Sequence, residues 1–433
     1  MPGNCLCRQT RKATMGSSLP HYNACLVNSL FSSFRQVPMA LRLRWVLFYL
    51  VSLASIFLFY AFLVFNGSSR AAQQWGIVSI VIFTLEWLYF GRFLNQNHRE
   101  GETEVLPTFG PGNSLSLLRG TLLAMIAGFL FLPRPLGLLA WGPAALYIIS
   151  DFTDFFDGYL ARRANHATRL GETLDMDLDS LGVFVVVLLS IQYGVLPWWY
   201  LSVALARYLF VFGIWWRTRR DLPIYDLRPS TSRRVIAGLQ MGFLTAMLFP
   251  VLGPPATYLG AVLFFLPFSI GFLYDWLQVS GVVQEPSEQQ AKWINRIWNF
   301  ATGWLPTVLR IAIVVVLIYF LRYVTFVNPN RLDVFAPRGM PNPSVTLFVF
   351  WVIELLILIV LGLGAAGRIT AIVALIYTGI KLQFEPLTWP YWILTISYTA
   401  ILFLGTGKYA LWKPEDTWHI RRGARAETQE EER

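Results

Sequence analysis

The sequence predicts an all-α fold, namely a polytopic integral membrane protein with about twelve transmembrane helices. Of its 433 residues, 55% are hydrophobic and 14% are charged. A soluble globular protein has about 45–50% apolar and about 25% charged residues. Apolar stretches near the roughly 20 residues that cross the hydrocarbon core as a helix recur along the chain. Composition and spacing together therefore favour a helical bundle embedded in a membrane.

The predicted spans follow one another along most of the chain. Each is an apolar run that is long enough, or nearly long enough, to cross the hydrocarbon core. Several are short, so we expect one or two of them to be tilted or re-entrant. We place the spans at 45–65, 75–93, 116–132, 136–153, 178–196, 198–216, 235–250, 256–277, 304–326, 344–366, 369–384 and 389–405.

Arginines gather in alternate loops between these spans. With twelve spans, the basic loops fall on one side of the membrane together with both termini. The positive-inside rule makes this side cytoplasmic. We therefore expect a multi-pass protein of the cell membrane, of the bacterial inner-membrane type. The residues concerned are Arg42, Arg44, Arg92, Arg99, Arg162, Arg163, Arg169, Arg217, Arg219, Arg220, Arg228, Arg233 and Arg234.

The net charge of +10 is explained by the same loops. Basic loops face anionic lipid headgroups, so membrane lipids account for the charge. The chain contains no soluble module that combines aromatic and basic residues, and we exclude nucleic acid as a partner. The three cysteines, Cys5, Cys7 and Cys25, precede the first span, so thiol chemistry is not expected in the membrane body.

Shifts in composition divide the chain into six parts. A polar segment, QEPSEQQAKWINR, interrupts the membrane body near its middle. We predict a polar tail at 1–40, two extra helices at 41–105, a catalytic core at 106–280, a polar linker at 281–299, four further helices at 300–412 and a charged tail at 413–433.

Six aspartates lie in the stretch SDFTDFFDGYLARRANHATRLGETLDMDLDSLG, residues 150–182. Asp154 and Asp157 are three residues apart, and Asp175 and Asp179 are four apart, so each pair shares one helix face. A short loop between the two helices favours their direct contact, which would bring the four carboxylates together. The other two acids, Asp151 and Asp177, have no assigned role, and we expect Asp151 one turn outside the site.

Converging carboxylates at a membrane interface need compensating cations or protons. Oxygen ligands select Mg²⁺ or Mn²⁺ over zinc or copper, and one or two such ions suit a diphosphate. Gly158 and Ala161 leave room for a headgroup near the backbone, and Arg162 offers a fork for phosphate. Two alternatives remain open at this point: a solvated acidic patch, and a cation- or proton-coupled transporter that uses the same acids.

The pattern Asp154-x-x-Asp157-Gly158-x-x-Ala161-Arg162, eight residues, then Gly171-x-x-x-Asp175-x-x-x-Asp179 resembles the signature of the CDP-alcohol phosphatidyltransferase family. All eight signature positions match. The resemblance extends over about residues 106–280. It includes the upstream segment GPGNSLSLLRG, which is similar to the start of the family's first core helix at Asn113, Leu115, Ser116 and Arg119.

The resemblance implies a six-helix core with its site at the cytoplasmic face. Asp154, Asp157, Asp175 and Asp179 would bind one or two Mg²⁺ or Mn²⁺ ions, and Asp179 would also be the general base. The donor would be CDP-diacylglycerol or a related CDP-linked lipid, the acceptor a small alcohol, and CMP would leave. The protein could also form a homodimer. The residues that would contact the nucleotide or its diphosphate are Asp154, Gly158, Ala161, Arg162 and Gly171.

The acceptor is indicated by segments 204–217 and 232–241, which resemble parts of phosphatidylglycerophosphate and cardiolipin synthases. Arg207, Arg217 and Arg234 are thus candidates for binding an acceptor phosphate, as in glycerol 3-phosphate. Those synthases read Asp-Pro-x-Ala-Asp-Lys where this chain reads DMDLDS at 175–180. An inositol-phosphate or cardiolipin-type acceptor therefore stays open as an alternative.

The C-terminal spans resemble the DoxX-like membrane family at ILFLGTGKYALWKPED and, loosely, at 361–375. No function or site follows from this similarity. Glu354, Lys381 and Arg310 are ionisable residues in or near these helices, and we expect one buried pair among them. Glu86, in the second span, is an intramembrane acid without an assigned role.

Overall fold

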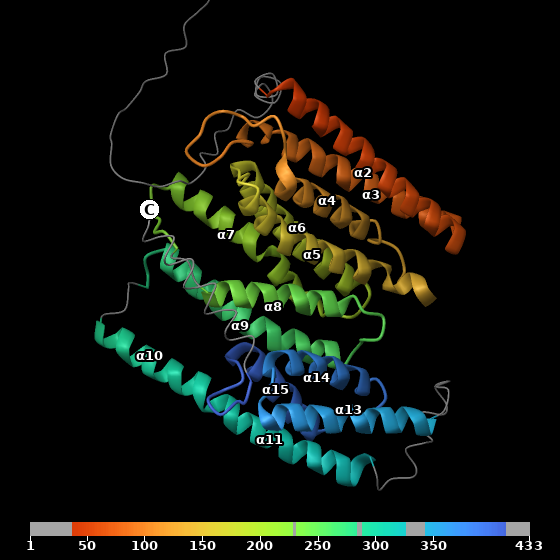
Figure 1. Cartoon of the computed structure of the whole chain (residues 1–433), viewed down its shortest axis with the longest axis vertical. Coiled ribbons are helices and arrows are strands. Elements are labelled where there is room, and N and C mark those ends of the chain that lie inside the picture. The colour runs from red at the N-terminus through yellow and green to blue at the C-terminus, as the bar shows by residue number, and fades with distance from the viewer. Residues whose placement is uncertain (1–36, 228–230, 284–287, 326–342, 413–433) are drawn as a thin grey trace, which may run out of the picture.

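The computed structural model describes residues 37–227, 231–283, 288–325 and 343–412, and its regular elements are helices (Figure 1). The predicted all-α fold is therefore confirmed. Most of the expected N-terminal tail and all of the expected tail at 413–433 lie outside the described residues.

Each predicted span overlaps a helix. The helices are α2 Met39–Asn66, α3 Ser69–Gly91, α4 Gly110–Ala127, α5 Gly142–Arg163, α6 Arg169–Gln192, α7 Leu201–Arg219, α8 Thr231–Met247, α9 Ala256–Val279, α10 Glu288–Gly303, α11 Leu305–Tyr319 with a π-helical end at Phe320–Thr325, α13 Pro343–Leu363, α14 Gly367–Lys381 and α15 Trp389–Leu404.

Five helical segments within the described residues are long and apolar enough to cross a membrane by themselves. They are Met39–Asn66, Ser69–Gly91, Trp198–Arg219, Ala256–Val279 and Asn299–Arg322. Helices α5 and α6 carry the acidic stretch, and α8, α14 and α15 are short. The protein is thus polytopic, and the count of twelve crossings stays a prediction.

Helix α10 occupies much of the segment that we expected to be a polar linker. Its polar composition resembles that of a loop, but Trp293, Ile297 and Phe300 recur at helical spacing and are exposed on one face. The mean polarity of the segment hid this periodicity, which explains why the helix was not predicted.

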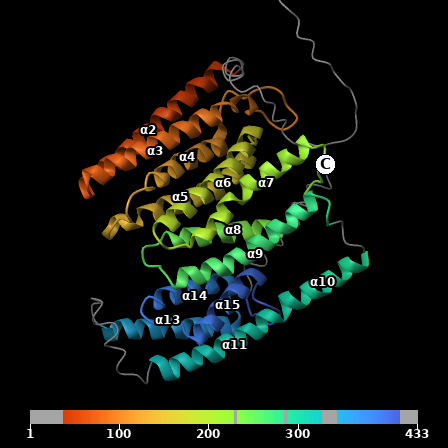
Figure 2. The same cartoon turned by 180° about the vertical axis from the view of Figure 1, so that it is seen from behind.

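The helices lie side by side in one continuous array, and both views agree on their order (Figures 1 and 2). Helices α2 and α3 stand at one end and α4–α9 in the middle. Helices α11 and α13–α15 form the other end. Within the array, α4 contacts α3, α5 and α6, so it is buried along most of its length.

Small residues let helices approach α4 closely, as is common where helices pack within membranes. A Cβ at Gly112 would lie 2.7 Å from the Cβ of Ala161 on α5. A Cβ at Gly128 would lie 2.7 Å from the indole of Trp75 on α3, whose Nε1 donates to the carbonyl of Met125 at 3.0 Å. These contacts hold α4 between α3 and α5.

The C-terminal helices pack on the end of the central group at α9. Gln383 donates to the carbonyl of Gly253 at 2.8 Å, and the rings of Phe264 and Phe403 lie 5.5 Å apart. The expected buried pair is present: Lys381 donates to Glu354, both side chains being nearly inaccessible. Arg310 instead donates to main-chain carbonyls near the end of the described chain.

Replacing Lys381 by Met should destabilise the protein by about 3–5 kcal/mol, because the buried carboxylate of Glu354 loses its cation. The double variant Glu354→Gln/Lys381→Met should recover most of the loss. Thermal denaturation of the detergent-solubilised protein measures the effect, with Lys408→Met, at an exposed lysine, as the control. An unchanged denaturation midpoint for Lys381→Met would show that the pair does not stabilise this helical group.

Candidate active site

The acidic stretch forms the adjoining ends of α5 and α6. Thr168 caps α6, and its Oγ1 accepts a hydrogen bond from the backbone N–H of Gly171 at 3.1 Å. Asn113 of α4 donates to the same Oγ1 at 2.9 Å and to Asn97 at 3.0 Å. A Cβ at Gly171 would lie 2.5 Å from Oδ1 of Asn113, so glycine permits this approach. The start of α6 is thereby fixed against α4.

Three carboxylates converge where these helix ends meet. One oxygen each of Asp154, Asp157 and Asp175 lie within 4.8 Å of one another. Asp157 is buried, whereas Asp154 and Asp175 are half-buried. Ser116 of α4 donates to Oδ2 of Asp157 at 2.9 Å, which orients that carboxylate. An oxygen-only cluster of this kind suits Mg²⁺ or Mn²⁺.

Arg119 of α4 binds three of the four signature aspartates. Its Nη1 lies 2.5 Å from Asp154 and 3.6 Å from Asp175, and its Nη2 donates to Asp179. The arginine is 2% exposed, so its charge depends on these carboxylates rather than on water. Asp179 is therefore held by Arg119 beside the three-carboxylate cluster and is not one of its members.

The side chains that form this site include more acidic groups than basic ones. Four carboxylates face one guanidinium, so the group carries excess negative charge whenever more than one of the carboxylates is ionised. Like charges this close repel strongly where water is partly excluded. The arrangement therefore favours a bound divalent cation at the three-carboxylate cluster.

A polar cavity of about 730 Å³ opens beside the cluster, within the size range of small-molecule sites. Six of the predicted site residues line it: Asp157, Gly158, Ala161, Arg162, Gly171 and Asp175. Ala161 also makes the close contact with Gly112, so a small side chain serves helix packing there as well as access.

The three candidate acceptor arginines have different surroundings. Arg207 is exposed, and its Nη2 lies 3.7 Å from Asp177. The positive charge of Arg207 also attracts the carboxylates of Asp175 and Asp179. Arg217 donates to the carbonyls of Pro223 and Ser280 at 2.8 Å and 3.1 Å, which ties the end of α7 to the end of α9. Arg234 is exposed on α8.

The two leftover aspartates have structural partners. Asp177 accepts from the hydroxyl of Tyr89 on α3 at 3.0 Å, in addition to its contact with Arg207. Asp151 accepts from Thr245 on α8 at 2.7 Å. These acids link the site helices α5 and α6 to their neighbours.

The sequence interpretation gave no role to Arg119. It named the residue only as part of the segment at the start of α4. An arginine within an apolar span needs an acidic partner, and this signal would have connected Arg119 to the aspartates. Ser116 and Asn113 carry no comparable signal, because small polar residues are common in helices that pack closely.

The carboxyl group of Glu86 is buried on α3 without a hydrogen-bond partner among the described residues.

Comparison with known proteins agrees with this site. Residues 111–272 match the CDP-alcohol phosphatidyltransferase family. A Mycobacterium tuberculosis protein with the provisional name cardiolipin synthase is 31% identical over 140 residues, which cover 31% of this chain and 63% of that protein. A Bacillus subtilis protein named CDP-diacylglycerol–glycerol-3-phosphate 3-phosphatidyltransferase is 37% identical over 71 residues, covering 16% of this chain and 37% of that protein.

The same name belongs to a Cereibacter sphaeroides relative, which is 37% identical over 89 residues, covering 20% of this chain and 39% of that protein. The chain thus spans less than two thirds of the length of these curated relatives. No solved structure matches it. The similarity of the C-terminal helices to the DoxX-like family stays a prediction, since the match to the CDP-alcohol phosphatidyltransferase family ends at residue 272, before α10. Residues 111–272 of the chain therefore constitute a domain of the CDP-alcohol phosphatidyltransferase family.

Proposed function

We propose that the chain is a membrane enzyme of phospholipid biosynthesis that transfers a phosphatidyl group from CDP-diacylglycerol to an alcohol and releases CMP. One observation carries this proposal: six of the eight signature residues of α5 and α6 line a polar cavity, and three carboxylates of these helices lie within 4.8 Å of one another. The family match over the same residues supports it.

Asp154, Asp157 and Asp175 would hold a divalent ion, and the fit rests on their converging oxygens and on the excess negative charge. Bound Mg²⁺ or Mn²⁺ would supply charge neutralisation for the donor's diphosphate. Whether the site takes one ion or two depends on Asp179, which in this structure is held by Arg119.

The protein side chains then have separate tasks. Gly158, Ala161 and Gly171 line the cavity that would receive the nucleotide, and Arg162 lines the same cavity. Asp179 is half-exposed, so an acceptor hydroxyl can reach it and give up its proton there. The acceptor oxygen forms a bond to the lipid-side phosphorus as the bond from that phosphorus to CMP breaks.

For the acceptor, we propose an alcohol that carries a phosphate, such as glycerol 3-phosphate. Arg207 is the best-placed cation of the three candidates, because it is exposed and lies beside Asp177 on α6. The names of the Bacillus and Cereibacter relatives favour glycerol 3-phosphate, and the mycobacterial name favours a cardiolipin-type acceptor. We also propose that the site faces the cytoplasm at a bacterial inner membrane; the arginine-rich loops support the cytoplasmic orientation.

Asp157→Asn should lower Mg²⁺-dependent CMP release from CDP-diacylglycerol by at least about a hundredfold, because one ligand and its charge are lost. Asp175→Asn should behave alike. Release of CMP in membranes or detergent micelles measures this, with Asp226→Asn, at an exposed loop aspartate, as the matched control. If the unsubstituted protein releases no CMP with any alcohol tested, the transferase proposal is wrong and ion transport should be examined.

Arg119→Gln should lower kcat by about a hundredfold, because Asp154 and Asp179 lose the fork that positions them. It should also lower the Mg²⁺ concentration at half-maximal activity, since a positive charge that opposes the cation is removed. Arg119→Lys should keep the positive charge but lose the geometry in which one nitrogen binds Asp154 and the other binds Asp179. Mg²⁺ titrations of CMP release measure both parameters. A higher Mg²⁺ requirement in Arg119→Gln would contradict the proposed role.

Arg207→Gln should raise the KM for glycerol 3-phosphate by about tenfold or more, with less effect on the KM for the CDP-linked donor. Arg217→Gln should mainly lower thermal stability, since that side chain binds main-chain carbonyls. Product lipids from a panel of glycerol 3-phosphate, inositol phosphate and phosphatidylglycerol identify the acceptor. Equal effects of Arg207→Gln on the two phosphate monoesters and on phosphatidylglycerol, which carries only a phosphodiester, would exclude Arg207 as the ligand of an acceptor phosphate monoester.

A further inference from the structure

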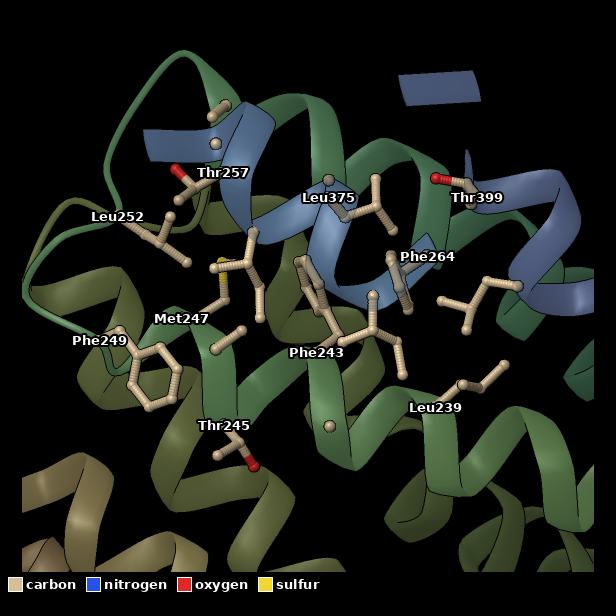
Figure 3. Close-up of a pocket in the computed structure, with 18 of the residues that line it drawn as sticks. Leu239, Phe243, Thr245, Met247, Phe249, Leu252, Thr257, Phe264, Leu375 and Thr399 are labelled. Carbon is tan, nitrogen blue, oxygen red and sulfur yellow. The ribbon is translucent and has the colours of Figure 1, made fainter. Parts of the chain in front are cut away.

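A second cavity, of about 610 Å³, lies between the family domain and the C-terminal helices (Figure 3). One wall comes from α5, α8 and α9, and includes Phe243, Met247 and Phe264. The opposite wall comes from α14 and α15, and includes Leu375 and Leu402. The second wall lies outside the residues that match the family. The cavity is therefore a feature of this chain's particular combination of helices.

The lining is almost entirely carbon. Its only carboxylate within the described residues is that of Asp151, which accepts a hydrogen bond from Thr245 at 2.7 Å, so the two groups satisfy each other. Thr257 and Thr399 also line the cavity, and their buried hydroxyls have no partner among the described residues. Such a site suits a long hydrocarbon occupant that carries an oxygen acceptor, as an acyl ester does.

The space is built into the helices rather than left by imperfect packing. Gly238 and Gly242 of α8 both line the cavity, and a Cβ at either position would meet no atom within 4 Å. Gly379 of α14 also lines the cavity, but a Cβ there would be 3.0 Å from Leu252, so this glycine permits a close contact rather than empty space. A void bounded by glycines in a helical bundle loses the dispersion contacts that side chains would supply, unless an occupant restores them.

The cavity adjoins the reaction site through α5. Asp151, Phe152 and Phe155 of this helix line the cavity, while Asp154 and Asp157 belong to the carboxylate cluster. Asp151 and Asp154 are separated by about 4.5 Å along the helix axis. The carboxylate cluster and the cavity are therefore close together along α5, within reach of one lipid molecule.

We propose that this cavity holds a hydrocarbon chain of the lipid substrate, and that α14 and α15 limit the length of chain that fits. The inference rests on the proposed phosphatidyl transfer for the identity of the lipid. It gives the C-terminal helices a function in substrate selection that the family domain does not provide by itself.

Filling the cavity should change the preference for chain length. In Gly242→Leu, the ratio of kcat/KM for dipalmitoyl over dioctanoyl CDP-diacylglycerol should fall about tenfold, the cost of displacing roughly two methylenes. Gly303→Leu is the matched control, because a Cβ there also meets no atom within 4 Å and the residue lies outside the cavity. An unchanged ratio in Gly242→Leu, or an equal loss with both donors, would overturn the proposal.

The contribution of α14 is tested with a second pair of variants. Leu375→Trp projects into the cavity and should lower the same ratio, whereas Val373→Trp, at an exposed position outside the lining, should not. If both variants change the ratio alike, or neither does, α14 does not limit the chain. This pair keeps the proposal falsifiable if Gly242→Leu fails to fold.

A binding measurement separates this inference from the proposed reaction. A CDP-diacylglycerol analogue with a diazirine on its acyl chain should, after illumination, label peptides of α8, α14 and α15 in the unsubstituted protein, and Gly242→Leu should label several-fold less. Labelling elsewhere would overturn the inference even if CMP is released. Absence of CMP release together with the expected labelling would instead refute the proposed reaction alone.

Discussion

The site depends on one buried arginine placed among carboxylates. Arg119 contacts Asp154, Asp175 and Asp179, and its 2% exposure leaves it almost no water for solvation. The acids in turn would repel one another without it. This mutual dependence fixes the relative position of α4, α5 and α6, because the guanidinium comes from the first helix and the carboxylates from the other two. It also leaves an excess of negative charge, which is what a cation-assisted reaction on a diphosphate requires.

Close packing of the helices lets Arg119 reach these carboxylates. Gly112 and Ala161 bring α4 and α5 together, and Gly171 admits Asn113 beside the start of α6. A larger residue at any of these positions would separate the helices and lengthen the contacts of Arg119. The same small residues border the polar cavity, so packing and access to the nucleotide are served by one set of positions.

The helices outside the family domain contribute residues that lie around the site. Tyr89 of α3 binds Asp177, which also contacts Arg207. Helices α14 and α15 close the apolar cavity behind α5. Helix α3 is thus joined to α6, whereas α14 packs on α9 and faces α5 across the cavity. Their position suits a role in orienting the substrates, while the chemistry belongs to the residues of the central group.

The sequence by itself determined the helical class, the approximate place of each helix, and the aspartate pattern, because hydrophobic runs and residue spacing are local properties. It also indicated one buried pair among Glu354, Lys381 and Arg310, since ions within apolar helices need partners, and the structure identified that pair as Glu354 and Lys381. It missed α10, whose apolar face is diluted by polar residues. Only the tertiary structure decided that Asp179 binds Arg119 beside the three-carboxylate cluster, that Arg217 holds main-chain carbonyls, and that Arg207 meets Asp177. These contacts join residues far apart in the chain, and their geometry follows from how the helices pack, which no local pattern encodes.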